Sequence, residues 1–108
     1  MESILTSIKK LLGIGEECKH FDDQIIMHIN TVLSILTQVG VGPSSGFEII
    51  DDGETWVDFL EEDPRLNMVK TYIYQKVKMV FDPPQSSTHM EALKQSIAEL
   101  EWRLNITG

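Results

Sequence analysis

The residues best suited to chemistry are the carboxylates that gather between positions 48 and 63, a segment without Lys or Arg. Carboxylate oxygens are ligands that Ca²⁺ prefers, but a calcium loop of the EF-hand type needs oxygen ligands at alternate positions around an invariant glycine. With Gly53 as that glycine, Ile50 and Phe59 fall on ligand positions. The pattern therefore fails as a calcium loop. It is compatible with a solvated acidic surface or with an acidic patch that has a specific role. The eight residues are Glu48, Asp51, Asp52, Glu54, Asp58, Glu61, Glu62 and Asp63.

The segment 40–53 is the second candidate, because its glycines and serines resemble a phosphate-binding loop. Such a loop requires the pattern G-x-x-x-x-G-K-[ST] after a strand, and this segment contains no lysine. A single cysteine, Cys18, excludes a cysteine-based metal site and an internal disulfide. The three histidines and the many Ser and Thr residues show no nucleophile or metal-ligand spacing. The sequence therefore predicts no catalytic residue, metal site or cofactor, and we expect a protein that is not an enzyme.

Composition limits the classes of partner. The chain has 108 residues, enough for one domain, and a formal net charge of −8. This charge argues against nucleic-acid binding through a basic footprint, because phosphate contacts need clustered Lys and Arg. We find no secretory signal and no run of the roughly 18 apolar residues that a membrane span needs. These features predict a single-domain cytoplasmic product.

Residues 63–84 form the element around which the other helices are expected to pack. Asp63 and Pro64 suit the start of a helix, and Pro83 with Pro84 suits its end. Between them, apolar residues recur at helical spacing and spread over more than one face. A helix that is apolar on several sides has several neighbours. The sequence therefore predicts a central core helix.

The remaining segments predict shorter elements around this helix. Residues 3–12 and 21–39 show amphipathic helical spacing that ends at a glycine, and residues 54–60 suit a short helix. Thr88 and Glu91 form a capping-box pattern that opens a last helix, whose apolar seam should pack antiparallel on the central helix. We expect an all-α fold, a small bundle of four to five helices with one long loop after the second helix.

The second helix has an unusual polar face. No Asp, Glu, Lys or Arg occurs from Gln24 to Phe47, whereas a solvated helix face usually carries charges. Small neutral groups allow another surface to approach without burying an unpaired charge. The pattern fits either a subunit contact or a neutral solvent-facing surface. The predicted contact residues are Thr31, Ser34 and Gln38 on this helix, Phe47 in the loop that follows it, and the two tryptophans, Trp56 and Trp102.

The order of these segments resembles the head–tail connector proteins of long-tailed bacteriophages. The resemblance covers nearly the whole chain. It rests on the neutral second helix ending in residues 38–42 (QVGVG), on the run from Tyr72 to Pro84 (YIYQKVKMVFDPP), and on residues 99–104 (ELEWRL). None of these pieces is a catalytic motif, so the resemblance depends on their combination.

Membership of that family would imply a helical protein of the virion that assembles as a ring of about a dozen subunits. The ring would lie below the portal protein at the head–tail junction, after assembly in the host cytoplasm. It would continue the DNA channel without specific DNA binding and would present a docking surface to the next head-completion or tail protein. A negative net charge suits such a channel, because attraction to phosphates would impede DNA passage.

A small helical DNA-binding or regulatory protein is the alternative. A helix–turn–helix protein needs a basic recognition helix. The one cluster of cations on a predicted helix is Lys70, Lys76 and Lys78, and the other faces of that helix look buried.

Overall fold

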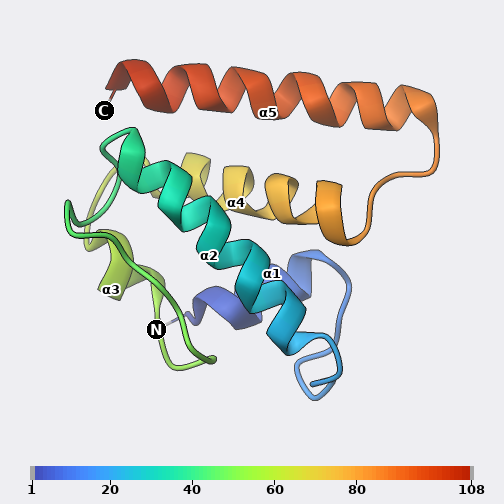
Figure 1. Cartoon of the computed structure of the whole chain (residues 1–108), viewed down its shortest axis with the longest axis horizontal. Helices are drawn as coiled ribbons and strands as arrows, with labels where there is room; N and C mark the ends of the chain where they lie inside the picture. The colour runs from blue at the N-terminus through green and yellow to red at the C-terminus, as the bar shows by residue number, and fades with distance from the viewer. Residues whose placement is uncertain (1, 108) are drawn as a thin grey trace.

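The computed structural model describes residues 2–107, which form five helices and no strand (Figure 1). An isolated antiparallel bridge joins Ser3 to Thr55. The expected all-α bundle, with its long loop after the second helix, is confirmed. The helices are α1 (Ile4–Leu11), α2 (Asp22–Gln38), α3 (Trp56–Leu60), α4 (Leu66–Phe81) and α5 (Ser87–Thr107).

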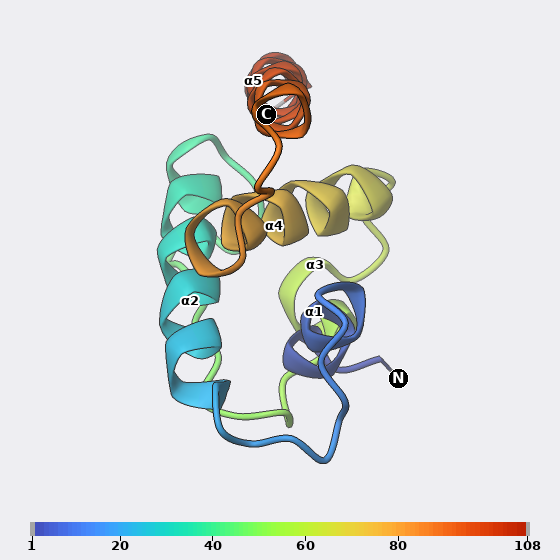
Figure 2. The ribbon, with the colours of Figure 1, turned by 90° about the vertical axis from the view of Figure 1, so that its right-hand side faces the viewer.

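Helix α4 is the centre of the bundle. In Figure 2 it lies between α5 on one side and α1 with α3 on the other, while α2 runs beside it. Its buried side chains, Val69, Tyr72, Ile73 and Val77, belong to the single apolar core that also includes residues of the other four helices. The prediction of a central core helix is therefore confirmed.

The start of α4 differs from the prediction. The helix begins at Leu66, because Asp63 is occupied by the turn before it. The Asp63 carboxylate accepts the backbone N–H of Arg65 at 2.8 Å and binds its guanidinium at 2.7 Å. The hydrogen bond from the Arg65 side chain is the main reason that the pKa of Asp63 lies below its ordinary value. The side chain that suited a helix cap thus closes a local turn instead.

Helix α1 is anchored through a buried cation. The Ser3 hydroxyl caps the helix by accepting the N–H of Thr6. Lys9 is only 2% exposed, and its ammonium lies 2.8 Å from an Asp22 carboxylate oxygen and donates to the Cys18 carbonyl at 2.6 Å. A buried ammonium requires such partners because desolvation of an isolated charge is costly. Lys9 therefore fixes residues 13–20 and the start of α2 against α1.

The long loop after α2 is fastened to that helix by one side chain. The Asn30 amide donates to the Ile49 carbonyl at 3.0 Å, and its oxygen accepts the Ile49 N–H at 2.8 Å. Asn30 thus provides the hydrogen bonds that a neighbouring strand would provide, although residues 47–50 are not a strand. Val41 and Ile49 are buried and anchor the two ends of the loop in the core.

Gly42 is expected to be sensitive to substitution. Its φ of +83° is one that glycine tolerates best, and a Cβ here would overlap the ring of the buried Phe59. Gly42→Ala should lower the free energy of unfolding by about 2 kcal/mol, measured by chemical denaturation. Gly46 is a matched control, since it also has positive φ but no atom within 4 Å of the position that a Cβ would take. Equal losses in Gly42→Ala and Gly46→Ala would contradict the overlap.

Helix α5 runs antiparallel to α4 and covers one of its sides (Figure 1). The capping box predicted at Thr88 and Glu91 is wrong, because α5 begins at Ser87 and the Ser86 hydroxyl accepts the N–H of His89. Ile97 and Leu104 of the predicted seam are buried, and Leu93 and Leu100 pack against the core. The expected antiparallel packing is confirmed.

Candidate functional site

After Asp22 and Asp23 in its first turn, the exposed side of α2 is uncharged from Gln24 to the end of the helix. Thr31, Ser34 and Gln38, the three contact residues predicted on this helix, are all exposed, and so is Met27. Positions 27, 31, 34 and 38 are spaced three and four residues apart, so their side chains lie on one face. We call this set (Met27, Thr31, Ser34 and Gln38) the neutral face.

A hollow of about 450 Å³ opens between the neutral face and the long loop. Phe47 forms part of its wall, and the Phe47 ring is half-buried, with its centroid 5.2 Å from that of Phe59. The structure thus brings together three predicted contact residues, Ser34, Gln38 and Phe47. The residues that line the hollow are Ser34, Thr37, Gln38, Ser45, Gly46, Phe47 and Glu48.

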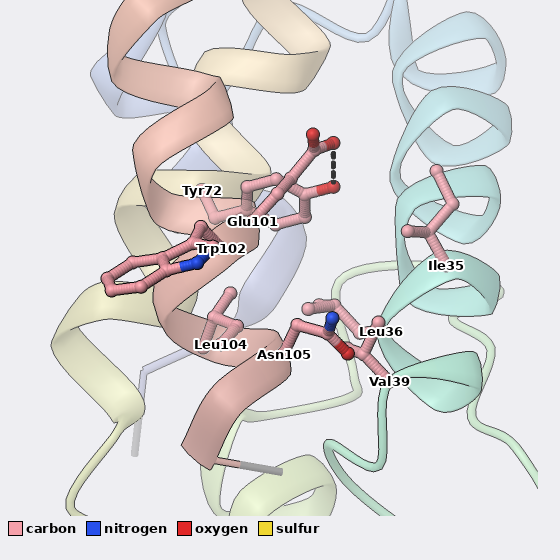
Figure 3. A pocket seen from close by; sticks show the side chains of 8 residues that line it. All are labelled: Ile35, Leu36, Val39, Tyr72, Glu101, Trp102, Leu104 and Asn105. Atoms are coloured by element: carbon pink, nitrogen blue, oxygen red, sulfur yellow. Dashed lines mark hydrogen bonds between the residues drawn. The ribbon is translucent and has the colours of Figure 1, made fainter.

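A second depression, of about 280 Å³, lies between α2 and α5 (Figure 3). We call it the α2–α5 groove. Ile35 and Val39 line it from α2, Tyr72 from α4 and Leu104 from α5, whereas the Trp102 indole points to the side of α5 away from α2. The spacing of apolar residues in α2 predicts that Val39 belongs to the core. That spacing cannot show whether the space between α2 and α5 is filled by side chains or left open as a groove. The full lining is Ile35, Leu36, Val39, Tyr72, Glu101, Trp102, Leu104 and Asn105.

The one carboxylate that lines the groove is engaged in its wall. The Tyr72 hydroxyl donates to Glu101 at 2.8 Å, and the Lys76 ammonium lies 3.5 Å from the same carboxylate oxygen. Burial of the phenol, with the adjacent carboxylate as a further cause, raises the pKa of Tyr72 well above its ordinary value. The phenol therefore stays protonated and joins α4 to α5. The groove is apolar apart from this engaged carboxylate and the Asn105 amide.

The two tryptophans have opposite environments. Trp102 is 61% exposed, so its indole is accessible for the predicted contact. Trp56 is only 2% exposed, and its indole N–H donates to the Ser7 hydroxyl at 3.0 Å. The predicted role of Trp56 in a contact with another protein is therefore replaced by a role in the core, where it joins α3 to α1.

The acidic segment is partly used for local structure. Asp58 and Thr55 form the capping box of α3. The Glu54 carboxylate accepts the backbone N–H groups of Ile50 and Asp51 at 3.0 and 3.3 Å. Within the part of the chain that the structure describes, no group of three or more His, Cys, Asp or Glu side chains is placed to hold a metal ion. These contacts make the segment a structured turn rather than a ligand cage.

The cations of α4 are paired. Lys70 binds Glu2 and lies 5.4 Å from the centre of the Trp56 ring, and Lys78 lies 3.6 Å from Asp82. With Lys76 already beside Glu101, this helix presents no free basic row of the kind that a DNA recognition helix needs. None of the helices within residues 2–107 has the length and apolar character required to cross a membrane.

The comparison with known protein families gives a match over nearly the whole chain. A model of a protein family described as phage connector protein matches residues 4–108. No curated protein and no solved structure matches the chain.

Proposed function

The chain belongs to the phage connector protein family, and from that premise we propose that it is the adaptor between head and tail in the virion. In this proposal about a dozen copies form a ring below the portal protein and continue the DNA channel. The ring then offers its other side to the next head-completion or tail protein. A structural connector role in the phage particle follows from the family itself.

The uncharged surface of the subunit is the observation that carries the proposal. Thr31, Ser34 and Gln38 are exposed, and Phe47 and Trp102 flank them across two depressions. None of these five residues is charged, so a contact centred on them avoids the burial of an unpaired charge, which would otherwise cost several kcal/mol. Interfaces are depleted of charged residues at their centre and enriched in aromatic ones. We assign Thr31, Ser34, Gln38, Phe47 and Trp102 to the subunit or portal interface.

The charge distribution supports passage of DNA without specific binding. The chain carries a net charge of −8, and the three lysines of α4 named above each have a carboxylate partner. Affinity for duplex DNA depends on the number of phosphates that Lys and Arg neutralise. A ring of such subunits therefore lets DNA slide.

Sedimentation of the purified protein over a concentration series, with and without portal protein, tests the proposal. We expect a monomer or weak oligomer at low concentration, and rings at high concentration or on the portal. Electron micrographs of the same samples should show the rings directly. A protein that stays monomeric at every concentration and does not bind the portal protein would rule out the adaptor function. A steep salt dependence of binding to duplex DNA would favour the DNA-binding alternative.

Trp102→Ala should separate assembly from stability. Because the indole is 61% exposed, we expect the free energy of unfolding to change by less than about 1 kcal/mol. Ring formation or portal binding should be lost, since exposed tryptophans are enriched among interface hot spots. Leu104→Ala is the control on the same helix: Leu104 is buried, so its loss should cost about 2–5 kcal/mol. A Trp102→Ala protein that unfolds easily but still assembles would contradict the assignment.

A further inference from the structure

Helices α1 and α3 begin at the same point of the molecule. Ser3 and Thr55, the residues that cap them, face each other in the isolated antiparallel bridge. Each hydroxyl accepts a backbone N–H group of its own helix at 3.2 Å, from Thr6 in α1 and from Asp58 in α3. Two helix starts that are far apart in the sequence therefore lie side by side.

Each of the two segments also provides a hydrogen-bond acceptor for the other helix. The first N–H groups of a helix have no carbonyl partner within that helix. The N–H of Ile4, the first residue of α1, donates to the Glu54 carbonyl at 3.0 Å. In return, the N–H of Trp56, the first residue of α3, donates to the Glu2 carbonyl at 3.2 Å. Separation of the segments would therefore leave an unpaired N–H group in both helices. This reciprocal cap comprises residues 2–4 and 54–56.

One lysine of α4 fastens the reciprocal cap to the bundle. The Lys70 ammonium donates to the Glu2 carboxylate at 2.8 Å and lies 5.4 Å from the centre of the Trp56 ring. The hydrogen bond from Lys70 is the main reason that the pKa of Glu2 lies below its ordinary value. The side chains of Lys70 and Glu2 are 28% and 55% exposed, so the ion pair contributes little to stability and is weakened by salt.

Helix α3 depends on this cap more than a longer helix would. It has five residues, and an isolated helix of that length is not stable in water. Its Phe59 side chain is buried, and the Phe59 ring centroid lies 5.2 Å from that of Phe47 in the long loop. Phe47 lines the hollow beside the neutral face. Loss of the cap would therefore loosen α3 and remove the support of Phe47.

We propose that residues 2–3 and α3 form one conformational unit that opens and closes while α2, α4 and α5 stay packed. In the closed state the reciprocal cap is formed and Trp56 is covered. In the open state both helix starts are unpaired, and the wall of the hollow loses its support. Proteins open locally in such units where few contacts hold a segment. The unit belongs to the free subunit, so the inference does not depend on ring formation.

Hydrogen exchange of individual amides, measured by NMR on the free subunit, tests the coupling. Ser3→Ala removes a side-chain cap from α1 alone. If the helix starts open together, we expect the Trp56 and Asp58 amides of α3 to exchange about fivefold faster. Ser86→Ala is the matched control, because the Ser86 hydroxyl caps α5 by accepting the His89 N–H at 3.3 Å. This control should leave the two α3 amides unchanged.

Removal of the lysine gives a second, independent measurement. Lys70→Met keeps most of the apolar part of the side chain and removes the ammonium. We expect the Ile4 and Trp56 amides to exchange at least about threefold faster than in the parent protein, with a smaller difference at high salt. Lys78→Met is the control on the same helix: Lys78 is also 28% exposed and lies 3.6 Å from Asp82. It should leave both amides unchanged.

Each outcome decides the inference. Joint acceleration of the amides at both helix starts, absent from the two controls, supports the unit. If Ser3→Ala accelerates exchange in α1 alone, the two helix starts open independently and the inference is overturned. It is also overturned if the Ile4 and Trp56 amides exchange as slowly as that of the buried Leu36, because only unfolding of the whole bundle would then expose them. Equal acceleration in the control variants would overturn it as well.

Discussion

A subunit that carries Ser34→Glu together with Gln38→Glu should fold normally and form no rings. Both side chains are exposed on the neutral face and line the hollow next to Phe47, so the monomer keeps the new charges in water. In an assembled ring the same charges would be buried without partners, at a cost of several kcal/mol. Across repeated interfaces of a ring, this cost should abolish assembly.

Circular dichroism and sedimentation of the double variant provide the measurement. We expect unchanged helical content and a single monomer boundary at concentrations where the parent protein forms rings. The control, Ser34→Gln with Gln38→Asn, alters the size of the same side chains without adding charge. It should form rings at lower concentrations than the glutamate variant does. Normal rings from the glutamate variant would show that the neutral face points to solvent.

Trp56→Ala should cause the largest loss of stability among the tryptophan substitutions, about 3–5 kcal/mol. The indole is buried between α1 and α3, and its removal leaves a cavity in the core. The Ser7 hydroxyl loses the indole donor but still donates to the Ser3 carbonyl at 2.6 Å, so most of the loss should come from packing. Chemical denaturation gives the value.

Trp56→Phe is the informative companion. It keeps an aromatic ring in the core and removes the indole N–H, so we expect a smaller loss of about 1–2 kcal/mol. If Trp56→Ala leaves stability unchanged but blocks ring formation, the residue belongs to the interface after all. We expect the opposite result: Trp56→Ala should lower stability, which places Trp56 in the core, and Trp102→Ala should impair assembly, which places Trp102 in the interface.

Most of the helices could be predicted because, in a long segment, the spacing of apolar residues indicates both the helix and the face that it buries. In α2 the buried residues Ile25, Ile29 and Leu36 repeat at helical spacing, and a glycine follows the end of the helix. The positions at which the helices begin and end were predicted less accurately. Asp63 has the chemistry of a cap, but its carboxylate binds Arg65 two residues later in a local turn, an alternative that helical spacing does not reveal.

The candidate site was predicted in part. The absence of charge from Gln24 to Phe47 can be read from the sequence, and the structure shows that Thr31, Ser34 and Gln38 are exposed, while their role in a contact stays a prediction. The burial of Trp56 could not, because a helix of five residues has no periodicity and the partner, Ser7, is 49 residues away. The α2–α5 groove depends on how α5 docks on α4, which local spacing does not determine.

The link between α1 and α3 also constrains the order in which the chain can fold. Trp56 and Ser7 are 49 residues apart, and the Ser3–Thr55 bridge spans a similar length. During synthesis the apolar side of α1 leaves the ribosome first, yet its partner on α3 is not available until position 56 has followed. By contrast, α4 and α5 are joined by five residues, so their pairing closes a short loop at low entropic cost. Helices α4 and α5 can thus pair locally as soon as α5 has been made, whereas α1 must wait for the middle of the chain before it completes its contacts.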